Sequence, residues 1–335
     1  MSGATTFSWR FPAALALAAG LSCAGVAGAQ EAQDGGWKYE LRPEWEVSGN
    51  LSKDKDMSAA AAFSPERALV ASDETRAVQS VRLDPASRQV IVGSAVPLWP
   101  GAGTELDIEG IAASETERAY FITGSHALSR KKKTFEASRG YVFKLPVDEH
   151  NNPKADAIEK VNFHAVLKKD EVLAPFLNVA AEDNGLDIEA LAERGGRLFF
   201  GLRAPSRGGK SFIVEIGAGE LFGGQTKVIR HEVALGAGRG IREMATLPDG
   251  SFLLIVGSSG TSEDEHATAK GFALWSWDGP SSAPRKISDM GLLPGKAEGM
   301  AIYEATDSVV KGVLFFDGAK NGAPTGFQLR RTSQP

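Results

Sequence analysis

The 335-residue sequence predicts an all-β fold, and three observations lead to that prediction. A phrase close to Asp-Ile-Glu-Gly-Ile-Ala recurs along the chain, at 107–112, 187–192, 240–245 and 295–301. Each copy is followed, after a short polar turn, by an apolar run of the kind that forms a buried strand. Few windows show the apolar period of a helix. Reuse of one supersecondary unit is typical of repeat architectures, among them the β-propeller.

A degenerate first copy at 58–63 brings the expected number of repeats to five. Each repeat is expected to hold strands separated by turns that are rich in Gly, Pro, Asp and Ser. The strands expected in the first four repeats are 58–63, 67–72, 77–83 and 89–96; 107–113, 119–124, 140–146 and 157–167; 187–192, 197–202, 211–216 and 227–234; 241–247, 251–256, 271–277 and 284–288.

The fifth repeat, with strands at 297–303, 312–316 and 326–330, ends one strand short, and an unassigned strand at 40–48 precedes the first repeat. A propeller closes its ring when such a strand completes the last blade, which leaves no long open edge. We therefore predict a β-propeller of five four-stranded blades closed by an N-terminal strand.

Two alternatives to this architecture stay open. The alanines that mark the repeats are spaced by 50, 80, 53 and 56 residues, and the long second interval has room for a sixth blade; these marker residues are Ala62, Ala112, Ala192, Ala245 and Ala301. The excess is polar or helical, with a short helix expected around Pro175-Phe176-Leu177, and this favours five blades. A two-domain β-sandwich is the other alternative.

The N-terminus has the pattern of a secretory signal. Arg10 is the only charge before the apolar stretch 11–29, and Ala27-Gly28-Ala29 places small residues where a signal peptidase cleaves. We expect a signal peptide at 1–29, a disordered tail at 30–36 and a single propeller domain at 37–335. The location is then periplasmic or secreted; a lipid anchor through Cys23, the one cysteine, is the alternative. No later stretch is long enough to span a membrane.

The charge composition limits the classes of binding partner. Without the signal peptide the chain has 36 Lys and Arg against 42 Asp and Glu, because Arg10 is lost. A net charge of −6 argues against nucleic acid and against anionic membrane surfaces as partners. A small anionic molecule or a protein is the expected partner.

The propeller geometry predicts where the functional residues meet. Inner strands begin, and second strands end, on the same face of the ring, so equivalent side chains gather at the mouth of the central channel. The inner strands bring Glu109, Glu189 and Glu298, with Asp107 on the same side of its strand as Glu109. In the fourth copy Arg242 takes the glutamate position. In the first copy, aligned on Ala62, the position falls on Ala59. The second strands bring further charges, among them Asp73, Arg203 and Asp317.

Three interpretations of these carboxylates stay open. The first is structural, with each glutamate neutralised by a neighbouring blade. The second is a site for Ca²⁺ or another hard divalent cation, with Asp107, Glu109, Glu189 and Glu298 as ligands. The third is acid–base catalysis by a crowded carboxylate with a raised pKa.

The basic residues suggest a binding role for the same face. We expect Arg203, Arg242, Lys296 and Lys320 to hold an anion. His126, at the root of the cationic loop 126–133, is the candidate for proton transfer or metal ligation. The competing interpretation is a solvated loop with a hydrogen-bonded histidine.

The sequence has no Gly-x-Ser-x-Gly, His-Glu-x-x-His or Gly-x-x-x-x-Gly-Lys motif. The phrase at 107–112, with Thr123-Gly124-Ser125-His126, Gly201-Leu202-Arg203 and Gly238-Arg239-Gly240-Ile241-Arg242, resembles a bacterial family of unknown function over 56–330. The Glu-Gly-Ile-Ala element also resembles the family named for the esterase-like activity of phytase, whose members are exported propeller-type proteins.

That second resemblance implies a phosphoester or ester hydrolase that uses channel carboxylates and Ca²⁺. Glu109 and Glu298 match its element, Glu189 matches less fully because Ala190 replaces glycine, and Arg242 departs from it. The sequence therefore suggests a hydrolase in which Glu109, Glu189 and Glu298 bind metal or act as base. A non-catalytic propeller that binds a ligand or a protein is the alternative.

Overall fold

The computed structural model describes Met1 and residues 36–101, 103–260 and 271–332. The expected signal peptide, and nearly all of the expected disordered tail, lie outside the described residues. The structure forms five separate β-sheets within the unit Ala32–Pro335. In the described residues no helix has the length and apolarity needed to cross a membrane.

Each sheet is one blade of antiparallel strands, numbered here in chain order. Blade 1 holds β3 (Met57–Ser64), β4 (Arg67–Ser72), β5 (Ala77–Asp84) and β6 (Gln89–Pro97). Blade 2 holds β7 (Ile108–Ser114), β8 (Ala119–Gly124), β9 (Tyr141–Pro146) and β10 (Glu159–Asn162). Blade 3 holds β11 (Asp187–Arg194), β12 (Arg197–Ala204), β13 (Lys210–Gly217) and β14 (Ile229–Ala234). Blade 4 holds β15 (Arg239–Thr246), β16 (Phe252–Ser258), β17 (Ala273–Trp277) and β18 (Arg285–Asp289). Blade 5 holds β19 (Lys296–Ala305), β20 (Val309–Asp317), β21 (Thr325–Arg331) and β1 (Trp37–Glu44).

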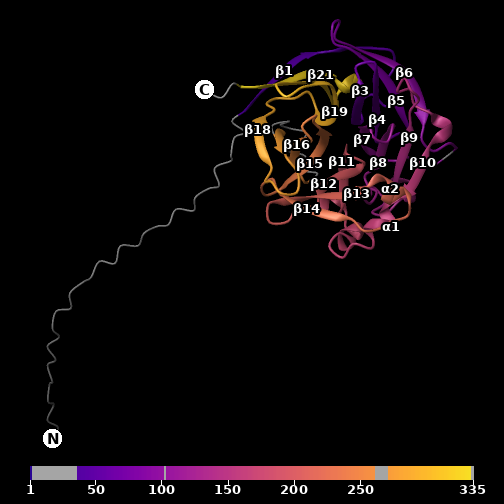
Figure 1. The fold of residues 1–335 in the computed structure, drawn as a ribbon. Coiled ribbons are helices and arrows are strands. Elements are labelled where there is room, and N and C mark those ends of the chain that lie inside the picture. The colour runs from indigo at the N-terminus through magenta and orange to yellow at the C-terminus, as the bar shows by residue number, and fades with distance from the viewer. Residues whose placement is uncertain (2–35, 102, 261–270, 333–335) are drawn as a thin grey trace. The chain divides into compact units, whose positions relative to one another are not determined.

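The N-terminal strand closes the ring, which confirms the five-bladed propeller. β1 pairs antiparallel with β21 as the outermost strand of blade 5, with Tyr39 opposite Leu329. The inner strands β3, β7, β11, β15 and β19 contact one another in that order, and β19 contacts β3 (Figure 1). The expected strand at 40–48 is divided at Trp45. The short β2 (Glu46–Ser48) runs parallel to β6 on the edge of blade 1.

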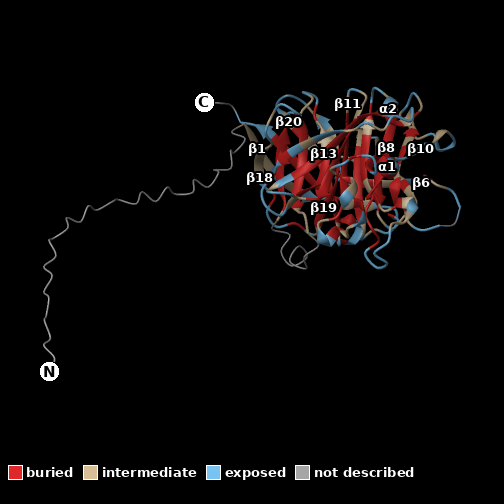
Figure 2. Ribbon diagram, turned by 90° about the horizontal axis from the view of Figure 1, so that it is seen from below, coloured by how far each residue is buried: buried red, intermediate tan, exposed pale blue. Residues whose placement is uncertain are grey.

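The core lies between the blades. Among the described residues, five apolar clusters fill the five interfaces between neighbouring blades. Adjacent residues of one strand face different interfaces: Phe200 of β12 packs against blade 2 and Phe199 packs against blade 4. This explains why the strands are continuous apolar runs, because both faces of a blade are buried. Figure 2 shows buried strands between exposed loops.

The long second interval contains helices and no sixth blade. The expected strand at 157–167 is wrong in its second half, where α1 (Phe163–Leu167) follows β10 and Asn162 caps it by accepting the Ala165 N–H at 2.9 Å. α1 inserts Phe163 and Leu167 into the cluster between blades 2 and 3. The helix expected around Pro175 is a 3₁₀ turn, η3 (Ala174–Asn178), followed by η4 (Ala181–Asp183). The sequence did not indicate α2 (Ala218–Phe222).

Removal of β1 should open the ring. A chain that starts at Trp45 loses the strand that covers β21 and exposes the apolar residues of the blade 4–5 cluster. An open edge pairs with other chains, so the truncated protein should melt at least about 10 °C lower and aggregate, as a loss of several kcal/mol implies for a domain of this size. Thermal unfolding and size-exclusion chromatography, against a chain that starts at Gly36, measure this. Equal melting temperatures would show that β1 is not the closure.

Candidate functional site at the channel mouth

Every inner strand has a β-bulge near its start. In β7, Ile108 pairs with Gly124 and Gly110 pairs with Thr123, so Glu109 is the extra residue. The same shift of register occurs in the other four inner strands. The five extra residues are Ser58, Glu109, Glu189, Arg242 and Glu298. A bulge turns its side chain away from the regular alternation, and its repetition gives each blade one equivalent side chain at the same end of the channel.

The structure corrects the alignment of the first repeat. Ser58, and not Ala59, is the bulged residue of β3, and Ala61 is the counterpart of Ala112. The alignment on Ala62 was therefore wrong by one residue. The segment 59–62 is all alanine, so no difference between side chains fixes its register, which only the pairing with β4 determines.

Two further sets of equivalent positions flank the bulged residues. The residues that precede the last pair before the bulge of each inner strand are Asp56, Asp107, Asp187, Gly240 and Lys296. The residues that follow that pair on each second strand are Asp73, Ser125, Arg203, Gly257 and Asp317. Across these positions and the bulges, blades 3 to 5 contribute three cations, whereas blades 1 and 2 contribute four carboxylates and no cation. The charge around the channel mouth is therefore uneven.

Blades 3 to 5 neutralise their carboxylates with a chain of ion pairs. Arg203 contacts Asp187 at 2.7 Å and Glu189 at 2.8 Å. Arg242 contacts Glu189 at 2.7 Å and also pairs with Glu298. Both arginines are only 1% exposed. The expected metal ligands Glu189 and Glu298 are thus partners of the arginines that were expected to hold an anion. Arg203 pairs within blade 3, and Arg242 pairs with both neighbouring blades.

The remaining expected residues divide between the site and other parts of the molecule. Lys296 is buried and binds Asp317 at 2.8 Å. Lys320 is exposed in η5 (Lys320–Gly322) and does not line the cavity described below. His126 is fully buried, with Nε2 3.2 Å from the Thr123 hydroxyl. Its ring lies edge-on to Phe163, at a centroid distance of 5.5 Å.

His126 therefore does not face the channel. Its loop begins at the channel mouth, as expected, but a backbone φ of 60° and the apolar surroundings direct the ring into the protein. Burial lowers the pKa of His126 well below its usual value, and the nearby His164 adds to that effect. The imidazole is thus held neutral, away from the carboxylates.

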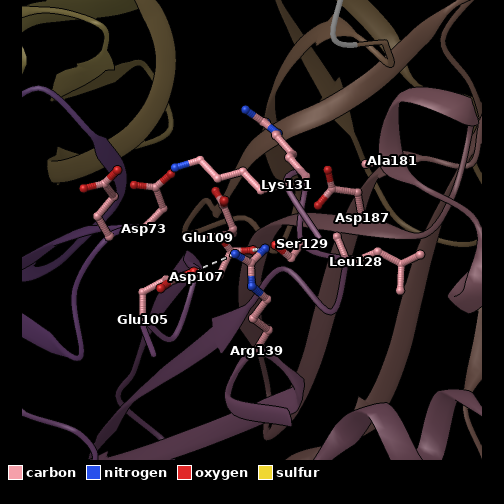
Figure 3. Close-up of a pocket in the computed structure, with 13 residues that line it drawn as sticks. Asp73, Glu105, Asp107, Glu109, Leu128, Ser129, Lys131, Arg139, Ala181 and Asp187 are labelled. Atoms are coloured by element: carbon pink, nitrogen blue, oxygen red, sulfur yellow. Dashed lines mark hydrogen bonds and ion pairs between the residues drawn. The ribbon is translucent and has the colours of Figure 1, made fainter. Parts of the chain in front are cut away.

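Blades 1 and 2 supply an open group of acids. Asp73, Asp107 and Glu109 each offer one carboxylate oxygen, and these oxygens all lie within 4.8 Å of one another. We call these three residues the acidic triad. They line a cavity of about 420 Å³, with the triad on one side and Asp187 on the other (Figure 3). This volume falls in the range of small-molecule sites.

The members of the triad differ in their partners. Asp107 accepts hydrogen bonds from Ser125 and, at 2.8 Å, from Arg139, which also binds Glu105 (Figure 3). Within the described part of the chain, Glu109 forms no hydrogen bond or ion pair, and the buried Oδ1 of Asp73 has no partner. The two carboxylates are therefore available to a ligand.

Crowding changes the pKa values of these groups. Burial, together with the charges of Asp107 and Asp317, raises the pKa of Asp73 to about 8. Burial, with Asp107 and Glu189, raises the pKa of Glu109 well above its usual value. Burial raises the pKa of Glu298 to about 7, although Arg242 opposes the rise. Without a bound cation, the face thus holds protons at neutral pH.

One further buried acid connects two neighbouring inner strands. Glu243 follows the bulge of β15, where the other blades have only alanine or glycine. Its carboxyl accepts N–H groups from Met244 at 2.8 Å and from Met300 of β19 at 3.3 Å. Burial raises its pKa well above the usual value. When the repeats are aligned, Glu243 stands where the other repeats have a small residue. This difference is the feature of the sequence from which a buried role for Glu243 could have been predicted.

Loss of one bracing arginine should destabilise the protein strongly. Arg203→Gln leaves the buried Asp187 without its guanidinium and Glu189 with Arg242 alone, which costs about 3–5 kcal/mol. Lys210→Gln removes one charge from an exposed pair with Glu232 and should cost less than about 1 kcal/mol. Denaturant unfolding compares the two variants. Equal losses of unfolding free energy in the two variants would contradict a stabilising role for the buried ion pairs of Arg203.

The stability of the metal-free protein should fall as pH rises from about 6.5 to 9. Asp73 and Glu298 have pKa values of about 8 and 7 in the folded protein, against about 4 in an unfolded chain. The folded state therefore binds more protons, and the stability that these protons confer disappears as pH passes through the folded pKa values. His126 and His164 have lowered pKa values in the folded protein, and they change the stability only below about pH 6.5, where the unfolded chain begins to protonate them.

Melting temperatures in the presence of a chelator measure this slope. Glu109→Gln removes one of the neighbouring negative charges. The fall in melting temperature with pH should then be smaller, because fewer carboxylates repel one another. A variant slope equal to that of the unsubstituted protein would show that the triad does not cause the pH dependence.

Comparison with known proteins identifies the family. The family model described as Protein of unknown function (DUF3616) matches residues 56–145 and 143–321. No curated protein matches the chain.

Solved structures with a similar fold include U3-55K (10% identity, TM-score 0.37, 86% of this chain and 66% of that one), so the chain spans just under two thirds of that protein. They also include the aldose sugar dehydrogenase of Streptomyces coelicolor in its PQQ-bound form (12%, TM-score 0.43, 90% and 100%) and a luciferin-regenerating enzyme (9%, TM-score 0.40, 88% and 96%). Likenesses this weak transfer no activity. The family match covers well over half of the chain, and the protein therefore belongs to the family described as Protein of unknown function (DUF3616).

Proposed function

We propose that the protein is an exported, metal-assisted hydrolase of phosphoester or ester substrates, and that its reaction takes place in the cavity at the channel mouth. The observation that supports this proposal most is the acidic triad. Three carboxylate oxygens within 4.8 Å of one another line a cavity of small-molecule size, and two of the three carboxylates have oxygens without a partner in the described chain.

The residues fit a hard divalent cation such as Ca²⁺. All three ligands are carboxylates, the donor type that Ca²⁺ and Mg²⁺ prefer. Burial and mutual repulsion raise the pKa values of Asp73 and Glu109, so a positive charge beside them relieves a cost that the metal-free fold carries. We therefore propose Asp73, Asp107 and Glu109 as the metal ligands. Of the four ligands expected from the sequence, Asp107 and Glu109 are kept, and Glu189 and Glu298 are not.

Neighbouring residues hold one member of the triad, Asp107, in place. Ser125 and Arg139 bond to Asp107, and Arg139 is itself fixed by Glu105 at 2.7 Å. Such outer contacts orient a ligating carboxylate. A bound cation would act as a Lewis acid on the scissile group and lower the pKa of a water molecule. We assign Asp107 and Glu109 to this centre and add Asp73, which the sequence placed only at the end of a second strand.

Glu298 is the group suited to accept or release a proton. Its pKa of about 7 leaves it partly ionised at neutral pH, which suits a general base or acid. Its charge also contributes to the raised pKa of Asp73. Glu189, held between two arginines, positions Arg242 against Glu298. No proton-transfer role is proposed for His126, because its ring points away from the cavity.

Substitution of the unpartnered triad member tests this function. Glu109→Gln should lower hydrolysis of a phosphoester panel about 100-fold or more and abolish the rise in melting temperature that Ca²⁺ causes, because a neutral amide is a poor ligand. Glu74→Gln is the matched control. It lines the same cavity and loses the same charge, but its carboxylate pairs with Lys53 at 2.8 Å, and it should keep activity.

Two outcomes would count against the hydrolase. Activity that survives Glu109→Gln would remove the triad from the reaction. Ca²⁺ binding without turnover of any phosphoester or ester would instead indicate a propeller that binds a ligand.

A further inference from the structure

A compact loop stands over the acidic triad. Leu128 and Phe135 form an isolated antiparallel bridge, and between them the Ser129 N–H donates to Thr134 at 2.9 Å and the Lys133 N–H donates to Ser129 at 2.8 Å. Phe135 stacks on His164 with ring centroids 3.6 Å apart. We call Ser129–Thr134 the rim loop. These contacts at its base fix where its side chains project.

The four cations of the rim loop fall into two pairs. Lys132 binds Glu136 at 2.8 Å and Lys133 pairs with Glu182, so both are neutralised by carboxylates. Arg130 and Lys131 line the cavity and form no hydrogen bond or ion pair with any described residue. Half of the positive charge of the loop therefore faces the cavity without compensation.

The positive rim and the acidic triad do not neutralise each other. Burial raises the pKa of Asp107, and Arg139 and then Arg130 oppose the rise, so Arg130 is near enough to act on the triad by its field. It nevertheless forms no ion pair with Asp73 or Glu109. The cavity thus has a negative floor and a positive rim. A ligand that satisfies both ends has a cation at the floor and an oxyanion at the rim.

The other cations that the structure describes near the cavity already have carboxylate partners. Arg203, Arg242 and Lys296 bind acidic residues of the inner ring. Arg139 is shared between Glu105 and Asp107. Among the described residues that line the cavity, Arg130 and Lys131 are the cations left for a ligand.

We infer that Arg130 and Lys131 form an oxyanion subsite, and that the substrate is a phosphate monoester and not a neutral ester. The inference rests on the proposed function and names its substrate class. A guanidinium offers two parallel N–H groups to the oxygens of one phosphate, and an ammonium adds a point charge. A neutral acyl ester would leave both cations without a counter-charge.

Binding of inorganic phosphate tests the subsite directly. Isothermal titration should be performed with Ca²⁺ and, separately, with chelator. The double variant Arg130→Gln, Lys131→Gln should bind phosphate about 10- to 100-fold more weakly, since each charge-assisted hydrogen bond strengthens binding by about tenfold.

The double variant Lys132→Gln, Lys133→Gln is the matched control. It loses the same charge from the same loop, but its lysines already have partners, and its affinity should change less than about threefold. Equal weakening in both variants would reduce the effect to general electrostatics. No phosphate binding by the unsubstituted protein under either condition would also overturn the subsite.

Kinetics separate this inference from the proposed function. With p-nitrophenyl phosphate, the Arg130, Lys131 variant should raise KM and leave kcat almost unchanged. With p-nitrophenyl acetate, neither constant should change. Equal effects on both substrates would reject the phosphate preference while leaving the hydrolase. Phosphate binding that depends on Arg130 and Lys131, in a protein that binds no Ca²⁺, would keep the subsite and reject the metal-assisted hydrolase.

Discussion

Each blade of this protein is apolar on both faces, and the rest of the structure depends on that constraint. Neighbouring residues such as Phe199 and Phe200 enter different interfaces, so a blade is buried only when another blade covers each face. A row of blades would leave two exposed faces, and a ring leaves none. β1 completes the ring by hydrogen bonding to the last strand of the chain. The stability of the fold is therefore cooperative around the ring.

The bulges convert this packing arrangement into a site. In a regular strand, successive side chains enter the two interfaces on either side of the blade in turn. The one extra residue in each inner strand instead directs its side chain to the channel mouth. The five bulged positions are chemically different because the repeats have diverged. Arg242 in blade 4 and Arg203 in blade 3 neutralise carboxylates near them, while Glu109 in blade 2 forms no ion pair with any described residue. The difference between blades is what creates an acidic cavity on one side of the channel.

This arrangement costs stability and creates binding capacity. Buried carboxylates with raised pKa values repel one another, and pairing with arginine offsets part of that repulsion in blades 3 to 5. The rim loop repeats the contrast on a smaller scale, because two of its cations are paired and two face the cavity. Groups left uncompensated beside a cavity are typical of functional sites, where a ligand supplies the missing charge.

The sequence by itself determined the architecture, because the period of the repeat, the missing fifth-blade strand and the early unassigned strand are all local patterns. It also indicated which residue types gather at the channel mouth, since equivalent positions of a ring share one face. It could not determine which charges pair. Whether Glu189 meets Arg242 or a ligand depends on distances of a few ångströms between blades. The direction of the His126 ring depends on one backbone angle and on Phe163. Phe163 is 37 residues further along the chain, in a helix where the sequence predicted a strand. Only the tertiary structure settled these points, because side chains far apart in the chain compete there for the same partners.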